Sequence, residues 1–500
     1  MKKFINKLSL SLFTFTTLLF LFATGCKQKE EHRDYSKDII GKWKLMNYNG
    51  HTIETNNRTI FTFNSDNTGT QTEAAIDSVD LLTDRTWRAA WPLAYSLDQD
   101  VLTTLWQRTS DARKWVAPKI KIENGHLYAD PSTVFINSLP TPLAAAEYVS
   151  VTDVAHYTED IIGTWVGKSG SGGAYGDINH QWIYLADGTY QYLSKNEEGK
   201  FVQDPGDSIN EYILDGDFFI SRWIDGTGEH REAWDVTLFG NDMIWRGLRA
   251  NGVRDSFFLE RITPVRADIE PILPGKWIVL LQNGDSVLTN EKSVHTFDGE
   301  GKVKYTVAQA GKLNHQWENQ TVLNYTLMGN DLTEVGKSVS GSDIVYHSQF
   351  LSVNPNRLEV RSNIGRREGT IVLERDLSVD NDKKILGFWE GVSMEGLGTY
   401  GGADNVAWEY FNDGTYNYYT KDADGNWVEQ EGEHDYMVDG KYLACRWADK
   451  DDPQQMDCEW WDLSFSEGDN PEYMYWDGYR ISDGKKYHNT FTIKRSSHAK

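Results

Sequence analysis

The sequence predicts an all-β protein built from four tandem domains, because one short motif recurs at domain-sized intervals and strand-like runs fill the stretches between its copies. The motif is Gly-x-Trp after apolar residues, and its glycines lie 122, 112 and 112 residues apart. Solenoid repeats are about 20 to 50 residues long, whereas a unit of about 110 residues can bury a core of its own. The four copies are Gly41-Lys42-Trp43, Gly163-Thr164-Trp165, Gly275-Lys276-Trp277 and Gly387-Phe388-Trp389.

The strands are clearest in the second and fourth units. The stretches "QWIYLADGTYQYLSK" and "AWEYFNDGTYNYYTK" place Asp187-Gly188 and Asp413-Gly414 between runs rich in β-branched and aromatic residues. Asp-Gly supplies the positive φ that a tight hairpin needs. Further strand-like runs follow at short intervals, without a helical stripe between them. About eight short antiparallel strands in about 110 residues predict a barrel or a sandwich.

The N-terminus predicts a secreted, lipid-anchored protein. A basic start precedes an apolar run shorter than a membrane-spanning helix, so residues 1–25 fit a secretory signal. Ala23-Thr24-Gly25-Cys26 resembles the lipobox of bacterial lipoproteins, which implies lipidation of Cys26 and attachment to a membrane through the lipid. Residues 26–37 form a polar tether. Within it, Lys29-Glu30-Glu31 resembles the signal that exports lipoproteins of Bacteroidetes to the outer face of the outer membrane.

The charge of the chain excludes one class of partner. It carries 74 acidic and 50 basic residues, which gives a net charge of −24. An acidic surface repels phosphate backbones, and no basic cluster offsets that field. We therefore expect no nucleic-acid partner.

A family resemblance favours the barrel over the sandwich. Gly-x-Trp on the first strand, with an Arg near the end of the last, is similar to the signature of lipocalins and calycins. In that family the Trp plugs one end of an up-and-down barrel and the Arg stacks over it. The resemblance implies four lipocalin-like antiparallel barrels, at residues 38–155, 156–265, 266–380 and 381–500, with the pairs Trp165 and Arg261, Trp277 and Arg375, and Trp389 and Arg495. The first unit keeps Gly41 and Trp43 but has no clear closing Arg, which leaves its closure open.

The units alternate between two types. When the motifs of the second and fourth units are aligned, Arg222-Trp223 matches Arg446-Trp447 and Trp234-Asp235 matches Trp461-Asp462. The first and third units have shorter opening loops and lack most of these aromatics. The order is therefore A-B-A-B, which indicates duplication of a two-domain block.

Aromatic residues of the two B units are the main ligand-binding candidates. If each Asp-Gly turn is a three-residue loop, four aromatics fall on one face of each hairpin. Such a face fills a core, lines a cavity for an apolar or amphipathic ligand, or forms a platform for glycans. The sets are Trp182, Tyr184, Tyr190 and Tyr192, and Trp408, Tyr410, Tyr416 and Tyr418.

Charged residues accompany further tryptophans in the same units. In each, an Arg-Trp pair and a Glu two residues before a Trp are expected on neighbouring strands. An Arg–Glu pair among tryptophans either holds a ligand carboxylate or hydroxyl or forms a structural ion pair. The residues are Arg222, Trp223, Glu232 and Trp234 in the second unit, and Arg446, Trp447, Glu459 and Trp461 in the fourth.

A glycine-rich loop follows the first strand of each B unit, "GKSGSGGAYGDINH" and "GVSMEGLGTYGGADNV". In the first of these the lysine is misplaced for a phosphate-binding loop, and strands flank the segment on both sides. The lipocalin resemblance places these loops beside the open mouth of a barrel. There they would act as lids or be ordinary surface loops.

Two cysteines remain after Cys26. Cys445 and Cys458 end a polar loop between strand-like runs in an oxidising compartment, so we predict a disulfide between them. The alternative is two buried thiols on different sides of the sheet.

No motif predicts catalysis, a bound metal or a cofactor, because nucleophile elbows, metal-ligand spacings and paired cysteines are missing from the sequence. We predict a lipid-anchored envelope protein that holds small apolar or amphipathic ligands in its barrels. The alternative is a surface module that binds glycans or proteins through exposed aromatics. Neither is an enzyme.

Overall fold

The computed structural model describes residues 33–74, 90–107, 111–151, 156–171, 179–203, 209–250, 252–307, 320–338, 340–364, 367–396, 402–449, 451–452, 454–482 and 484–497. The predicted signal, Cys26, Lys29-Glu30-Glu31 and the centres of both glycine-rich loops, 172–178 and 397–401, lie outside these ranges. Within them, no helix combines the length and apolarity needed to span a membrane.

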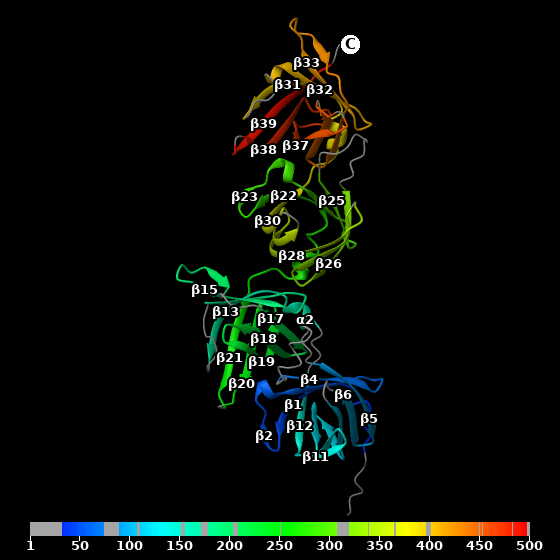
Figure 1. Cartoon of the computed structure of the whole chain (residues 1–500), viewed down its shortest axis with the longest axis vertical. Coiled ribbons are helices and arrows are strands. Elements are labelled where there is room, and N and C mark those ends of the chain that lie inside the picture. The colour runs from blue at the N-terminus through cyan, green and yellow to red at the C-terminus, as the bar shows by residue number, and fades with distance from the viewer. Residues whose placement is uncertain are drawn as a thin grey trace, which may run out of the picture.

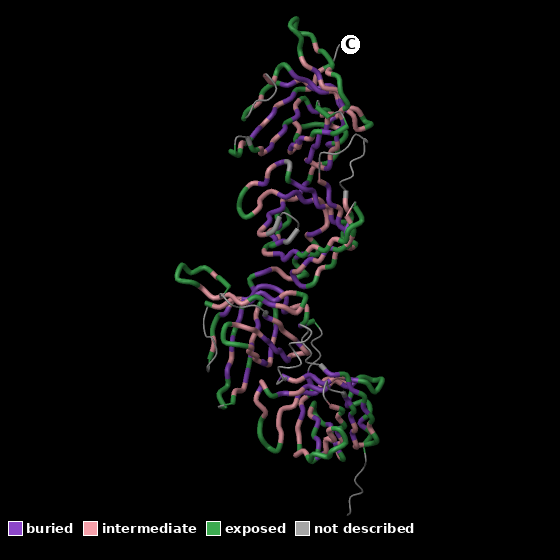
Figure 2. Tube along the Cα trace, viewed as in Figure 1, coloured by how far each residue is buried: buried purple, intermediate pink, exposed green. Residues whose placement is uncertain are grey.

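Four antiparallel sheets make up the chain, one for each Gly-x-Trp motif, over residues 41–151, 163–261, 275–376 and 387–495. The sheets follow one another in chain order along the long axis of the molecule (Figure 1). Buried residues fill the interior of each (Figure 2). The protein is therefore all-β with tandem lipocalin-like barrels, as the sequence predicts.

The third barrel is the simplest, because its sheet closes on itself. Apart from the short β23, each strand pairs with the next along the chain, and the last then pairs with the first. A bulge between Val279 and Leu281 bends the first strand where it meets the last. The strands are β22 (Gly275–Gln282), β23 (Asp285–Ser286), β24 (Val294–Phe297), β25 (Lys302–Thr306), β26 (Gln320–Met328), β27 (Asp331–Lys337), β28 (Asp343–Asn354), β29 (Arg357–Ile364) and β30 (Arg367–Asp376).

The second and fourth barrels share one strand order. Each sheet runs from a short edge strand through the first and last strands of the unit to a second edge. Single bridges, Thr189 with Glu211 and Thr415 with Asp435, join this second edge to the residue that precedes the strand beside the short edge strand. The second barrel contains β13 (Gly163–Ser171), β14 (His180–Tyr184), β15 (Tyr190–Lys195), β16 (Phe201–Gln203), β17 (Ile209–Asp215), β18 (Phe218–Asp225), β19 (Gly228–Phe239), β20 (Asp242–Leu248) and β21 (Arg254–Arg261). The fourth contains β31 (Gly387–Glu395), β32 (Val406–Tyr410), β33 (Tyr416–Lys421), β34 (Trp427–Glu429), β35 (His434–Asp439), β36 (Tyr442–Ala448), β37 (Met456–Phe465), β38 (Tyr473–Ser482) and β39 (Lys485–Arg495).

The first barrel closes through an interrupted strand. Its last strand, β12, pairs with its first strand, β1. Strands β7 and β8 lie far apart in the order of paired strands, but only Pro118 and Lys119 separate them along the chain. The chain therefore completes the ring at this point. The strands are β1 (Gly41–Tyr48), β2 (His51–Thr52), β3 (Thr59–Phe63), β4 (Thr68–Glu73), β5 (Ala90–Asp98), β6 (Val101–Gln107), β7 (Ala112–Ala117), β8 (Ile120–Glu123), β9 (His126–Ala129), β10 (Ser132–Ile136), β11 (Leu139–Leu143) and β12 (Ala146–Val151).

The motif tryptophan is buried at one end of every barrel. Its Nε1 donates a hydrogen bond of 2.6 to 2.8 Å to the carbonyl four residues earlier in all four units. In the second and fourth units this carbonyl belongs to the residue that directly follows a short helix, α2 (Tyr157–Asp160) or α4 (Asn381–Lys384), and in the third unit it belongs to Leu273, four residues after the end of α3 (Arg266–Ile269).

The predicted closing arginines stack over these rings. The guanidinium carbon lies 4.4 Å from the ring centroid for Arg261 on Trp165, and 4.2 Å for Arg375 on Trp277 and for Arg495 on Trp389. Each guanidinium also donates to a backbone carbonyl just before the motif. The three pairings are therefore confirmed, and within the described ranges Trp43 has no such arginine.

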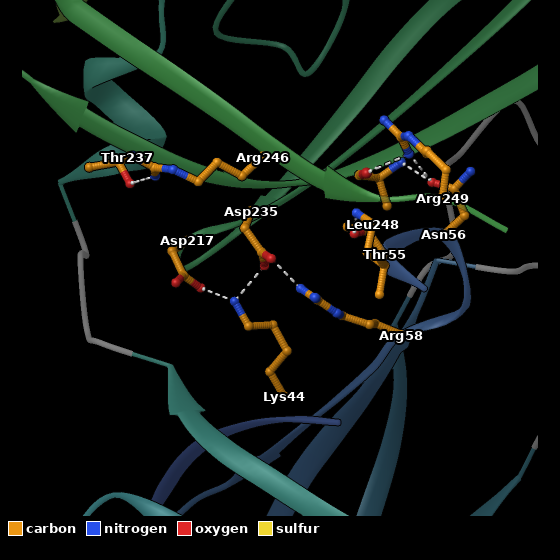
Figure 3. Close-up of polar contacts among 11 residues, drawn as sticks. Lys44, Thr55, Asn56, Arg58, Asp217, Asp235, Thr237, Arg246, Leu248 and Arg249 are labelled. Atoms are coloured by element: carbon orange, nitrogen blue, oxygen red, sulfur yellow. Dashed lines mark hydrogen bonds and ion pairs between the residues drawn. The ribbon is translucent and has the colours of Figure 1, made fainter. Parts of the chain in front are cut away.

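Each A barrel packs against the B barrel that follows it. In the first pair, Lys44 of β1 binds Asp217 and Asp235, and Arg58 binds Asp235 as well (Figure 3). Phe218 and Ile220 on the outer face of β18 join the apolar core of the first barrel. The interface is thus both ionic and apolar.

The second pair repeats this interface. Lys276 binds Asp439 and Lys292 binds Asp462. The short 3-10 helices η1 (Thr55–Asn57) and η3 (Thr289–Glu291) also match: Thr55 Oγ1 accepts a hydrogen bond from the N–H of Leu248 at 2.7 Å, and Thr289 Oγ1 accepts one from the N–H of Tyr479 at 2.6 Å. The repeated unit is therefore a pair of barrels together with the contact between them.

Candidate ligand-binding site

A cavity of about 270 Å³ lies inside the second barrel, and the hairpin of β14 and β15 forms one wall. Trp182 pairs with Tyr192 and Tyr184 pairs with Tyr190, so these four side chains share one face. Gly188 has φ +84° in the three-residue turn that sets this register, as predicted. All four aromatics line the cavity.

Strands β18 and β19 supply further wall, because every second residue of a strand points to the same face. Trp182 meets Trp245 with 5.3 Å between ring centroids at 70°, and Trp234 meets Trp245 at 5.6 Å. The first contact is edge to face and the second is tilted, and such aromatic contacts hold the walls in place. The residues that complete the lining are Asn210, Ser221, Trp223, Asp225, Glu232, Trp234, Trp245 and Phe257.

The cavity extends away from the plugged end of the barrel. Tyr184 pairs with Gly163, at the start of the motif strand, and so lies at the plugged end. Asp225 is the last residue of β18, at the opposite end, beside the turn to β19. The cavity therefore reaches from the aromatic core toward the end that Trp165 does not fill.

Polar atoms inside the cavity lack partners. Asn210 Oδ1 and Trp245 Nε1 are buried, and within the described residues neither has a hydrogen-bond partner. Leaving a buried donor or acceptor unsatisfied costs about 1 to 3 kcal/mol. A ligand that offers one donor and one acceptor would satisfy both.

Two carboxyl groups face the same space. Burial raises the pKa of Glu232, against the opposing effects of the Arg249 charge and the Trp234 indole. Hydrogen bonds from the Thr227 hydroxyl and N–H lower the pKa of Asp225 to about 2. Asp225 is thus anionic at neutral pH, and Glu232 is a carboxyl group in a poorly solvated place.

The expected pairing of Arg222 with Glu232 is wrong. Arg222 pairs with Glu211, with 2.6 Å between Nη1 and Oε2, and its Nε lies 3.5 Å from Glu229. It lies next to Ser221 and Trp223 along β18, and since those residues face the cavity, Arg222 faces the other side of the sheet. Arg222 therefore forms a structural ion pair and does not line the cavity.

The fourth barrel repeats this arrangement. Arg446 pairs with Asp435, with 2.7 Å between Nε and Oδ1, and Glu459 stands opposite Cys445, so it faces the other side of the sheet from Arg446. Trp447 shares the inward face of β36 with Leu443 and Cys445. The other candidates, Trp408, Tyr410, Tyr416, Tyr418 and Trp461, also pack in the interior of this barrel.

The predicted disulfide between Cys445 and Cys458 is wrong, since both cysteines are free. Cys445 pairs with Glu459 and Arg446 pairs with Cys458 across β36 and β37. This one-residue offset sends the two thiols to opposite faces of the sheet, and a disulfide needs side chains that point toward each other.

The sequence interpretation missed five lining residues: Asn210, Ser221, Asp225, Trp245 and Phe257. Trp245 and Phe257 stand in the strand-like runs "DMIWRGLR" and "DSFFLERI", where alternation alone would assign them to the inner face. Asn210, Ser221 and Asp225 carry no comparable signal, because small polar residues are as common on the outer face of a strand.

The third barrel has a different interior. Glu334 is buried there and accepts a hydrogen bond of 2.6 Å from the Tyr305 hydroxyl. Burial raises the pKa of Glu334 to about 7. The space beside it measures about 20 Å³, which is room for about one water molecule. This barrel is packed, in contrast to the second.

Comparisons with known proteins find no matching family model and no matching curated protein. Solved structures similar to the chain include a double mutant of transferrin binding protein B from Haemophilus parasuis, at 10% identity and a TM-score of 0.15, covering 73% of this chain and 82% of that one. The same protein from Neisseria meningitidis shows 12% identity and a TM-score of 0.14, over 65% and 67%. A porin-like protein from Bacteroides uniformis shows 7% identity and a TM-score of 0.12, over 75% and 92%. At such TM-scores these likenesses carry no argument about function.

Proposed function

We propose that the protein is a lipid-anchored binding protein of the bacterial cell envelope, and not an enzyme, which holds a small amphipathic molecule inside its second barrel. The observation that carries this proposal is the cavity whose aromatic walls also present unpaired polar atoms. Aromatic faces contact the apolar part of a ligand, while Asn210 and Trp245 offer hydrogen bonds to its polar part.

The size of the cavity limits the ligand. Its volume of about 270 Å³ lies just under the range of about 300 to 1,000 Å³ that is usual for ligand pockets. We therefore propose a ligand with a single ring or a short branched skeleton. The alternative, a surface platform for glycans or proteins, would need the candidate aromatics on the outside, and those of both B barrels point inward.

Calorimetric titration of the full mature chain tests the cavity. The probes are cyclohexanol, 4-methylphenol and methyl glucoside, which are neutral and small and combine an apolar face with a hydroxyl. We expect saturable binding of at least one, lost in Trp223→Ala and kept in Trp447→Ala, the matched change in the fourth barrel. Binding that persists in Trp223→Ala would contradict the proposal. So would the absence of measurable binding for all three probes and for choline.

The lipid anchor is tested separately. If Cys26 is the lipidated residue, Cys26→Ser should move the protein from the membrane fraction to the soluble fraction of the producing cells, without changing its thermal unfolding. Full recovery of the variant in washed membranes would contradict the anchor.

A further inference from the structure

The two B barrels each contain an arginine at the same place in the fold, but its ion-pair partner differs. Arg249 follows β20 and Arg480 lies at the same place in β38, and each stacks over the corresponding tryptophan, Trp234 at 3.9 Å and Trp461 at 4.1 Å. In the second barrel the guanidinium pairs with Asp255, with 3.0 Å between Nε and Oδ2.

The partner strand decides this difference. Asp255 stands opposite Gly247 in the second barrel, and Asn489 stands opposite Gly478 at the matching place in the fourth. An asparagine carries no charge, and there the arginine pairs with the glutamate that matches Glu232: Arg480 Nη2 lies 3.1 Å from Glu459 Oε2. In the second barrel the equivalent glutamate, Glu232, has no ion-pair partner within the described residues.

The residues that line the cavity of the second barrel are of the kinds that bind organic cations. It contains eight aromatic side chains and two carboxyl groups, and among its described lining residues no lysine, arginine or histidine occurs. Faces of Trp and Tyr attract cations through the ring quadrupole, most strongly when the site is desolvated. A buried carboxylate is costly without a counter-charge.

We propose that the cavity of the second barrel takes an organic cation, a small amine or quaternary ammonium compound, which contacts the tryptophan faces and pairs with Glu232. This inference rests on the proposed function of the same cavity. The unpaired Asn210 Oδ1 accepts a hydrogen bond from a donor of the ligand, such as a hydroxyl. The fourth barrel has no such preference for a cation, because Arg480 already neutralises Glu459.

The test compares two molecules of the same shape, choline and its neutral carbon analogue 3,3-dimethylbutan-1-ol, by calorimetric titration of the full mature chain. We expect choline to bind at least ten-fold more tightly than the neutral alcohol. Glu232→Gln should abolish that difference while the alcohol still binds, and Glu459→Gln in the fourth barrel should leave it unchanged.

A second variant tests the cause. Asp255→Asn recreates the arrangement of the fourth barrel and frees Arg249 to pair with Glu232, so it should weaken choline binding with little effect on the alcohol. Equal affinities for both molecules in the unaltered chain, or a choline preference that survives Glu232→Gln, would overturn the cation proposal.

The outcomes also separate the two proposals. If neutral probes bind and are lost in Trp223→Ala but choline has no advantage, the cavity function stands and the cation proposal fails. If neither choline nor any neutral probe binds, both fail.

Discussion

Lys44 of the first barrel and Asp235 of the second form an ion pair with 2.6 Å between Nζ and Oδ1. The side chains of Lys44 and Arg58, which share this carboxylate, are only 8% and 4% exposed. Although burial alone would raise the pKa of Asp235, the two cations lower it overall. Asp235 thus binds two buried cations across the interface, of which Lys44 also has Asp217 as a partner.

Removing that carboxylate should therefore be costly. We expect Asp235→Ala to reduce the free energy of unfolding by about 3 kcal/mol, because it leaves the buried Arg58 without its carboxylate partner and Lys44 with Asp217 alone. Urea unfolding measures the change. The control is Glu260→Ala, which breaks an exposed ion pair with Lys168 and should cost less than about 1 kcal/mol. Equal losses for both variants would show that the interface pair contributes no more than a surface pair.

The closing arginine of the second barrel gives another prediction. Arg261 stacks on Trp165 and donates a hydrogen bond of 2.6 Å from Nη1 to the carbonyl of Ile162. Arg261→Met keeps the length of the side chain but removes both interactions, and we expect a loss of about 2 kcal/mol. Thermal unfolding checks it against Arg246→Met, which alters an exposed arginine of the same barrel. A melting temperature unchanged by Arg261→Met would rule out a stabilising role.

Glu334 predicts a pH dependence of the third barrel. Its pKa of about 7 exceeds the ordinary value of 4.5, so the folded barrel keeps a proton that the unfolded chain releases between pH 4.5 and 7. The contribution of this group to stability is fully present below pH 4.5 and falls as the pH rises through 7, by about 3 kcal/mol.

Glu334→Gln should remove this dependence, because glutamine keeps the shape and does not titrate. Thermal unfolding at pH 5 and pH 8 should differ less in this variant than in the unaltered chain, and the variant should be the more stable at pH 8. The exposed Glu300→Gln serves as control. An identical pH profile for all three proteins would mean that Glu334 titrates normally.

The cysteines should behave as thiols. Burial raises the pKa of Cys445 well above its usual range and that of Cys458 to about 12, so both should react slowly in the folded chain. After unfolding in guanidinium without reductant, a chain with Cys26 replaced should release two equivalents of thiol to Ellman's reagent. A chain that releases none would contain the disulfide after all.

How much of this the sequence predicts depends on the kind of signal. The Gly-x-Trp motif and its arginine predict the barrels, and the Asp-Gly turn predicts the register of the hairpin, because each of these signals depends on local backbone geometry. The direction of a side chain on a strand depends on register with its neighbour. Arg222 and Glu232 lie on paired strands, as expected, but on opposite faces, so they do not pair. Cys445 and Cys458 also lie on opposite faces of two paired strands, so they form no disulfide.

Two further features were beyond sequence reasoning. The choice of Arg249 between Asp255 and Glu232 depends on a residue of the adjacent strand that is close only in the folded barrel. The interface between the A and B barrels joins residues almost 200 positions apart, such as Thr55 and Leu248. Neither pairing leaves a periodic signal in the sequence.

The plug of Trp165 and Arg261 makes the second barrel a vessel with one end sealed. If the second barrel binds the proposed ligand, that ligand would have to enter and leave at the opposite end, near Trp223 and Asp225. A bound ligand would then have to dissociate before another could bind, and the residues at this end would set the rate of exchange.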